Sequence, residues 1–127
     1  LYYSASWCGP CRQFTPRLVD AYQSLRNDYP EVEIVFVSAD NSAGDMKDYM
    51  KSDGMAWPAL KFDAVQTSEE IMRYCGNGIP CLVLVDEKGK VLSDTNQSGD
   101  YVGPQVVLDD TRKLLQKYRQ KNPRQKT

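Results

Sequence analysis

The sequence predicts a single mixed α/β domain, and three observations support this prediction. Short apolar runs typical of buried strands alternate with amphipathic stretches typical of helices through the first half of the chain. From residue 81 on, the chain has an apolar run, a glycine turn and another short strand, and it ends in a long amphipathic stretch. This order of elements is that of an α/β domain. Of the 127 residues, 1–120 are assigned to that domain and 121–127 to a polar tail.

The first half of the chain supplies two strands and two helices. Residues 1–5 predict a buried strand, whose beginning is cut short at the N-terminus, and a helix follows to about Asn27. Pro16 lies inside this helix, where it removes one backbone hydrogen bond and is expected to cause a kink. Residues 32–37 are nearly all apolar or β-branched, which predicts a central parallel strand covered on both faces. A short helix is predicted over residues 45–53.

The second half supplies a helix, a hairpin and a final helix. Thr67 and Glu70 form a capping box, which predicts a helix through about Tyr74. Residues 81–85 predict a second core strand, and the turn after them predicts an antiparallel hairpin. Pro104 opens the last helix, because proline fits the first helical positions. The apolar stripe expected on the inner side of that helix consists of Val107, Thr111, Leu114 and Tyr118.

Charge and composition exclude several classes of function. The 16 basic and 17 acidic residues nearly cancel, so neither nucleic acid nor an anionic membrane is an expected partner. The absence of histidine excludes histidine catalysis and histidine metal ligands. No apolar run approaches the roughly 18 residues of a membrane-spanning helix. We expect a monomer, and because the chain starts with Leu1 inside a strand, we expect an upstream segment to be missing.

The most informative motif is Trp7-Cys8-Gly9-Pro10-Cys11, which lies between the first strand and the first helix. A helix N-terminus presents unpaired N–H groups and a positive dipole end, which favour the thiolate that attacks disulfides. Cys8 is the predicted nucleophile, and Cys11, one turn further into the helix, is the predicted buried resolving thiol. The alternatives are a structural disulfide or half of a metal site. A zinc site would need four ligands, and the spacing of the two remaining cysteines is not a zinc-ribbon pattern, so no metal site is predicted.

With this motif the sequence resembles the thioredoxin superfamily, and several strings resemble its tryparedoxin and nucleoredoxin branch over roughly residues 1–92. The resemblance implies the thioredoxin fold, in which helices flank a central mixed sheet. It also implies a thiol–disulfide oxidoreductase that reduces protein disulfides, uses an unidentified electron donor and needs no bound cofactor. The alternative is a redox-inactive partner-binding module of a larger protein. The strings that carry the resemblance are residues 1–8, 14–18, 35–38 with Asp40, and 55–60.

The resemblance also implies a substrate-binding surface around the dithiol. Residues 78–80 match the superfamily's loop with a cis-proline, which makes Pro80 the expected cis-proline. The backbone of Ile79 would then pair with an extended segment of the substrate. Trp7 is expected to be half exposed and to form a flat docking surface, and Gly9 and Pro10 complete the expected binding residues.

The sequence departs from the family at several positions. Gly9-Pro10 stands where tryparedoxins carry two prolines, and it suggests a reductant near the thioredoxin end of the known range, roughly −270 mV. Ala39 replaces a family tryptophan, and Asn41 replaces an acid. Tyr2 replaces the buried aspartate of thioredoxin, and a phenol is a poor proton acceptor at neutral pH. Bacterial relatives of this branch suggest an exported or periplasmic protein.

The remaining candidate residues have structural interpretations. Cys75 and Cys81 are expected to be buried or half-buried free thiols, with Cys81 facing the core; the alternative is a second disulfide or a regulatory pair. Trp57 is expected in the core or in a groove wall. An acidic cluster is expected on a solvated face without a function, and it consists of Asp40, Asp45 and Asp48.

Overall fold

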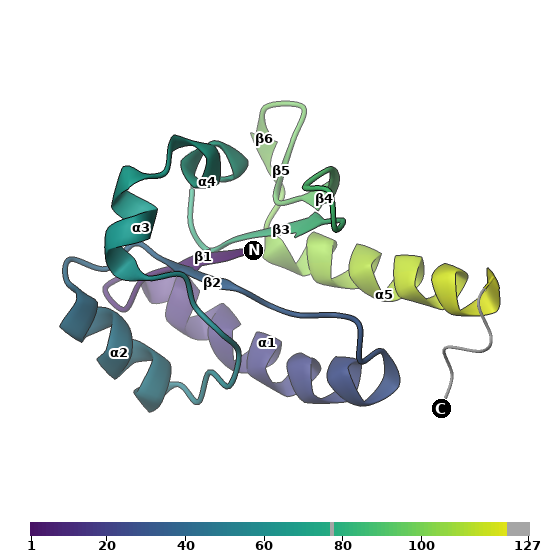
Figure 1. Cartoon of the computed structure of the whole chain (residues 1–127), viewed down its shortest axis with the longest axis horizontal. Helices are drawn as coiled ribbons and strands as arrows, with labels where there is room; N and C mark the ends of the chain where they lie inside the picture. The colour runs from purple at the N-terminus through teal and green to yellow at the C-terminus, as the bar shows by residue number, and fades with distance from the viewer. Residues whose placement is uncertain (77, 122–127) are drawn as a thin grey trace.

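A four-stranded sheet in the order β2-β1-β3-β4 forms the centre of the computed structural model, which describes residues 1–76 and 78–121 (Figure 1). Strand β1 pairs in parallel with β2 and antiparallel with β3, and β4 pairs antiparallel with β3. This mixed sheet with helices around it confirms the predicted fold class. The bounds of the four strands are Tyr2–Ser4 for β1, Phe36–Ser38 for β2, Cys81–Val85 for β3 and Val91–Asp94 for β4.

Two layers of helices cover the sheet. The longest helices are α1, Gly9–Asp28, which runs through Pro16, and α5, Pro104–Lys121; both pack on the face that holds the larger core cluster. The short helices α3, Phe62–Thr67, and α4, Glu69–Tyr74, lie across the opposite face (Figure 1). Helix α2, Ala43–Ser52, lies beside α1. The part of the predicted polar tail beyond Lys121 is outside the described residues.

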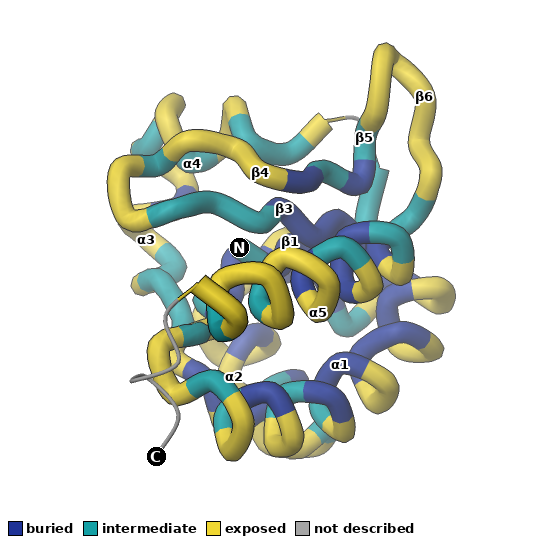
Figure 2. Tube along the Cα trace, turned by 90° about the vertical axis from the view of Figure 1, so that its right-hand side faces the viewer, coloured by how far each residue is buried: buried dark blue, intermediate teal, exposed yellow. Residues whose placement is uncertain are grey.

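Strand register assigns the core residues to these two layers. Tyr2 lies opposite both Phe36 and Leu82, and all three side chains belong to the cluster under α1 and α5. Tyr3 lies opposite Cys81, and these two side chains belong to the cluster under α3 and α4. Because side chains alternate along a strand, neighbouring residues of β1 serve opposite layers. Buried segments therefore concentrate in the sheet and on the inner sides of the helices (Figure 2).

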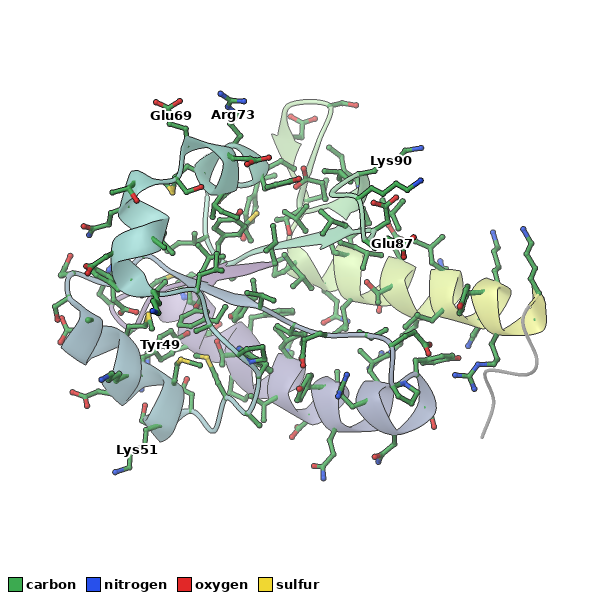
Figure 3. All side chains as sticks on the ribbon, viewed as in Figure 1. Tyr49, Lys51, Glu69, Arg73, Glu87 and Lys90 are labelled. Atoms are coloured by element: carbon green, nitrogen blue, oxygen red, sulfur yellow. A yellow bond between two sulfur atoms is a disulfide. The ribbon has the colours of Figure 1, made fainter. Side chains whose placement is uncertain are left out.

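Charged side chains lie around the outside of these layers. Figure 3 shows Lys51, Glu87 and Lys90 at the periphery, and Glu69 and Arg73 pointing outward from α4 as an exposed ion pair with an N–O distance of 3.8 Å. No helix of the described residues is long and apolar enough to cross a membrane.

Strand β2 is shorter than predicted, and it lies at the edge of the four-stranded sheet rather than at its centre. Its pairing with β1 starts at Tyr2 and Phe36, so residues 32–35 approach the sheet without forming a strand. Within this segment the Val35 carbonyl accepts the Tyr2 N–H at 2.9 Å. The approaching segment is held by α1, because the Arg26 guanidinium donates to the Val32 carbonyl at 2.6 Å.

The predicted capping box at Thr67 and Glu70 is wrong by one residue. Ser68 is the cap of α4, and its hydroxyl accepts the Ile71 N–H at 3.2 Å. Thr67 instead ends α3, a helix that the sequence did not predict, and its hydroxyl donates back to the Asp63 carbonyl.

The inner stripe of α5 is also only partly as predicted. Val107 and Thr111 are buried, but the side chains of Leu114 and Tyr118 are 37% and 40% exposed, and Leu108 takes a buried position instead. Leu114 and Tyr118 are exposed because α5 is longer than the sheet, so that its C-terminal half projects beyond the sheet (Figure 1). A small hairpin that the sequence did not predict, β5 Asn96–Gln97 with β6 Asp100–Tyr101, lies between β4 and α5.

Candidate active site

Cys8 and Cys11 form a disulfide at the N-terminus of α1. Their Cα atoms are 5.2 Å apart, within the usual range for a disulfide. Cys8 is the N-cap residue of the helix, and its sulfur accepts the Cys11 N–H at a donor–acceptor distance of 3.3 Å. Cys11 is completely buried, whereas Cys8 keeps 7% of its surface exposed. Cys8 is therefore the sulfur closer to solvent.

This position gives Cys8 the electrostatics of a helix N-cap. The first turn of α1 contains Pro10, which lacks an N–H, and no acidic residue, so no nearby carboxylate on the helix opposes a negative sulfur. The N–H of Cys11 and the positive end of the helix dipole both stabilise a thiolate on Cys8.

In the reduced protein, the pKa of Cys8 is expected to lie below the free-thiol value of about 8.5, because of this helix N-terminus. The rate of alkylation by iodoacetamide as a function of pH measures the titration; fragmentation of the peptide of residues 1–12 distinguishes alkylation at Cys8 from alkylation at Cys11. Cys75 is the internal reference, since the interaction with Cys81 and burial both raise the pKa of the Cys75 thiol. Equal alkylation of Cys8 and Cys75 at pH 7 would contradict the assignment of Cys8 as the nucleophile.

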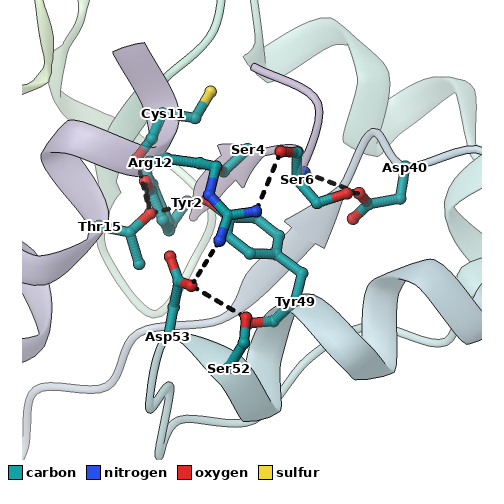
Figure 4. Close-up of polar contacts among 10 residues, drawn as sticks. All are labelled: Tyr2, Ser4, Ser6, Cys11, Arg12, Thr15, Asp40, Tyr49, Ser52 and Asp53. Carbon is teal, nitrogen blue, oxygen red and sulfur yellow. Dashed lines mark hydrogen bonds and ion pairs between the residues drawn. The ribbon is translucent and has the colours of Figure 1, made fainter. Parts of the chain in front are cut away.

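Asp40 fixes the loop that leads into the dithiol. This buried carboxylate accepts the N–H and the hydroxyl of Ser6 at 2.7 and 2.6 Å (Figure 4). It also accepts the hydroxyl of Ser38 at 2.6 Å. The prediction that Asp40 belongs to a solvated face is therefore wrong, because β2 carries it under the loop; Asp45 and Asp48 are exposed as predicted.

Trp7 continues the same loop. Its ring is 60% exposed, and its Nε1 donates to the Ala39 carbonyl at 3.1 Å, so the side chain is held at the surface beside Cys8.

Asp40→Ala is expected to destabilise the fold by about 1–3 kcal/mol, because it leaves the Ser6 N–H and two hydroxyls without their buried acceptor. Disulfide reduction is expected to fall as well, since the Ser6–Trp7 segment loses its anchor. Urea denaturation and insulin reduction measure the two effects. Asp40→Asn is the matched control, and it is expected to lose less, because one amide oxygen can still accept from Ser6. Equal stability of Asp40→Ala and the parent chain would contradict the anchoring role.

The segment 78–80 lies against the dithiol. Ile79 packs on Cys8, and its carbonyl oxygen is 3.8 Å from the Cys8 sulfur; the Ile79–Pro80 peptide bond is cis. Tyr101 of the unpredicted hairpin donates its hydroxyl to the Pro80 carbonyl at 2.6 Å. A Cβ atom at Gly78 would lie 3.1 Å from the Tyr101 ring, so a side chain there would crowd this contact. Sequence patterns could not indicate Tyr101, since it is 21 residues away.

A network of buried hydroxyls lies beneath the dithiol. The Thr15 hydroxyl donates to the Cys11 carbonyl at 2.9 Å. Because the Thr15 hydroxyl has only this one proton, it must accept from Tyr2 and Tyr49, whose hydroxyls lie 2.6 and 2.8 Å away. The Tyr49 proton is then used in turn, so Ser4 donates to Tyr49 at 2.6 Å. Burial raises the pKa of Tyr2. The network therefore offers Cys11 neutral hydroxyls and no carboxylate as a proton acceptor.

Arg12 is a further residue of the site that the sequence analysis did not name. Its guanidinium donates to the Ser6 carbonyl at 3.3 Å and to the Asp53 carboxylate at 3.4 Å, and it lies over the ring of Tyr49 (Figure 4). It thereby connects the first turn of α1 to the loop before Cys8 and to the end of α2. The signal in the sequence was a cation directly after Cys11.

The other two cysteines lie away from this site. Cys81 is buried at the start of β3, Cys75 is half buried at the end of α4, and both belong to the cluster on the α3–α4 face. The structure thus places Cys81 in the core as predicted. Within the described residues, no group of three metal-ligating side chains could hold a metal ion.

The double variant Cys75→Ala/Cys81→Ala is expected to keep near-normal turnover in a reducing assay, because neither sulfur reaches Cys8 or Cys11. It is expected to lose about 1–2 kcal/mol of stability from the packing of two sulfurs. Insulin reduction and urea denaturation measure both quantities. A tenfold loss of turnover in a folded double variant would show that the second pair carries electrons in catalysis.

A dithiol at the N-terminus of a helix, next to the central strands of a mixed sheet and to a cis-proline, defines a thioredoxin-like redox protein. A family model described as thioredoxin-like matches residues 1–91, and the chain belongs to this thioredoxin-like family.

Within the family, the chain is similar to nucleoredoxins and tryparedoxins. It is 41% identical to a probable nucleoredoxin of Arabidopsis thaliana over 74% of this chain and 16% of that protein. It is 39% identical to the tryparedoxin of Trypanosoma brucei brucei over 68% of this chain and 58% of that protein. It thus spans less than two thirds of either relative. Among solved structures, tryparedoxin II complexed with glutathionylspermidine is 35% identical with a TM-score of 0.63, over 74% of this chain and 65% of that one.

Proposed function

We propose that this chain reduces disulfide bonds of protein substrates by thiol–disulfide exchange through Cys8 and Cys11. The observation that carries the proposal is the position of the Cys8 sulfur, which caps a 20-residue helix, accepts the Cys11 N–H and is the sulfur nearer to solvent. A thiolate is stabilised there, and its resolving partner is already within bonding distance.

The exchange has two steps. The Cys8 thiolate attacks one sulfur of the substrate disulfide, whose bond breaks, and the other substrate sulfur leaves as a thiolate that takes a proton from water. Cys11 then gives up its proton and attacks the Cys8 sulfur in the mixed disulfide, which releases the second substrate thiol. The substrate gains two electrons, and the chain ends with the Cys8–Cys11 disulfide seen in the structure.

The proton of Cys11 has no carboxylate acceptor in the hydroxyl network beneath it. Water that enters with the substrate is therefore the proposed acceptor. Trp7, Gly9 and Pro10 are exposed next to Cys8, and Ile79 and Pro80 border it, so these five residues form the proposed substrate surface.

For the electron donor we propose a small thiol. The support comes from the solved relative, a tryparedoxin in complex with glutathionylspermidine, at 35% identity. The proposal names only the class of donor and not glutathionylspermidine itself, because Ala39 and Asn41 differ from the family pattern.

Insulin reduction by the chain, with dithiothreitol as electron donor, tests the proposed activity. The expected result is that the turbidity from precipitated insulin appears much earlier with the chain than with dithiothreitol alone. The alternative function, a partner-binding module without redox activity, is supported by the small share of the nucleoredoxin relative that the chain spans. A folded chain that does not accelerate insulin reduction would favour that module.

A further inference from the structure

A cavity of about 530 Å³ lies beside the dithiol, on the face of the sheet that α3 and α4 cover. Phe62 of α3 and Met72 of α4 line it, together with Ala39, which directly follows β2, and Ile79. Its volume is within the roughly 300–1,000 Å³ that is typical of ligand pockets. The cavity is therefore large enough to take up a whole side chain of a bound molecule.

Two of the lining residues connect this cavity to the dithiol. Ile79 packs on Cys8 and also on the apolar cluster under α3 and α4, so it contacts both the reactive sulfur and the cavity. The Ala39 carbonyl accepts the Nε1–H of Trp7 at 3.1 Å. The cavity is thus continuous with the proposed substrate surface at Trp7, Cys8 and Ile79.

The lining of the cavity is mainly apolar. Phe62 and Val65 contribute buried or half-buried carbon surface, and Met72, whose side chain is 54% exposed, contributes a flexible thioether that packs well against aromatic rings. Asp40 is the one charged side chain among the described lining residues, and its carboxylate already accepts hydrogen bonds from Ser6 and Ser38. An apolar group fits this lining, whereas an anionic group would be repelled by the carboxylate.

We propose that this cavity binds the aromatic side chain of a residue next to the reactive cysteine of the substrate. The inference rests on the proposed function and specifies its substrate class, which is protein disulfides whose cysteine has an aromatic neighbour in the sequence. Consecutive Cα atoms are about 3.8 Å apart, so a residue adjacent to the cysteine that reacts with Cys8 can reach the cavity past Ile79. Ala39 and Met72 then determine specificity without taking part in the exchange of electrons.

Peptide disulfides test this proposal. The reduced chain is mixed with the disulfide-linked dimer of acetyl-Gly-X-Cys-X-Gly-amide, in which X is Phe or Ala, and release of the peptide thiol is followed by liquid chromatography. Each rate is divided by the rate of the same peptide with dithiothreitol, which removes differences in intrinsic reactivity. The Phe peptide is expected to react roughly tenfold faster than the Ala peptide, a gain typical of filling an apolar pocket. Equal corrected rates would overturn the proposal and leave the reductase activity standing.

Two tryptophan variants show whether the cavity causes this preference. Ala39→Trp is expected to bring the ratio of the two rates close to one, because the indole occupies the space beside Ile79. Ala64→Trp is the matched control, since Ala64 is an exposed residue of α3 that is not among the described lining residues, and it is expected to keep the ratio. Circular dichroism checks that both variants are folded. An unchanged ratio in folded Ala39→Trp would contradict binding in this cavity.

A binding measurement separates this inference from the reductase activity. The peptide acetyl-Gly-Phe-Ser-Phe-Gly-amide, which has no cysteine, is titrated into the oxidised chain, and methyl signals are followed by nuclear magnetic resonance. The signals of Val65 and Met72 are expected to shift, with the buried core residue Met46 as the reference, and Ala39→Trp is expected to abolish the shifts. Unshifted signals of Val65 and Met72 would overturn the proposal. Shifts in a chain that reduces no peptide disulfide would support the cavity and refute the reductase function.

Discussion

Cys8→Ser is expected to lower the rate of insulin reduction by roughly a thousandfold or more, to the level of the reductant alone, because a serine hydroxyl does not form the attacking anion at neutral pH. This variant keeps the helix N-terminus, the Cys11 N–H and the contact with Ile79, but it lacks the nucleophile. The insulin assay and free-thiol counting on the substrate measure this loss.

Cys11→Ser is expected to have a different effect from Cys8→Ser, because it blocks the second step of the exchange and not the first. Cys8 can still attack, but the mixed disulfide is not resolved, so substrate accumulates in covalent linkage to Cys8. Non-reducing electrophoresis and peptide mapping detect this adduct. Circular dichroism of both variants is the control for folding. Trapping of substrate on Cys11 in the Cys8→Ser variant would reverse the order of attack proposed for the two sulfurs.

Trp57→Ala is expected to give the largest loss of stability, about 3–5 kcal/mol, because it opens a cavity beneath the sheet. The Trp57 side chain is 2% exposed, and its ring packs edge-on against Tyr2 and Tyr22, with centroid distances of 6.1 and 5.3 Å. Tyr2 in turn holds Thr15 under Cys11, so the loss is expected to loosen the site as well. Urea denaturation followed by far-UV circular dichroism measures the free energy of unfolding.

Trp57→Phe separates packing from hydrogen bonding. The indole N–H of Trp57 is buried without a hydrogen-bond partner among the described residues, so its removal costs no hydrogen bond, and the ring contacts largely remain. A loss well below that of Trp57→Ala is expected. Trp7→Phe, at the exposed tryptophan, is the surface control, with an expected loss of about 0.5–1.5 kcal/mol from the hydrogen bond to the Ala39 carbonyl. Similar losses for Trp57→Ala and Trp7→Phe would contradict the role of Trp57 in the core.

The sequence determined those parts of the protein that local patterns encode. The spacing of Cys8 and Cys11 before an amphipathic stretch predicted the dithiol at a helix N-terminus, because a cap and its first turn lie within four residues. The apolar run of β3 predicted a buried strand, and the turn after it predicted the hairpin. The prediction failed where two neighbouring residues could play the same role. Thr67 and Ser68 could each have capped α4, and the cap is Ser68.

The tertiary structure alone decided which distant groups support the site. Asp40 is 34 residues from Ser6, Tyr101 is 21 residues from Pro80, and Tyr49 is 34 residues from Thr15, so no helical or strand period relates them. Asp40 looked like a solvated acid until the parallel pairing of β1 with β2 carried it under the loop of Ser6. The same holds for Cys75 and Cys81, which the fold places in one apolar cluster. Such contacts are fixed by the packing of whole elements, because burial leaves each polar group only the partners that the fold brings within reach.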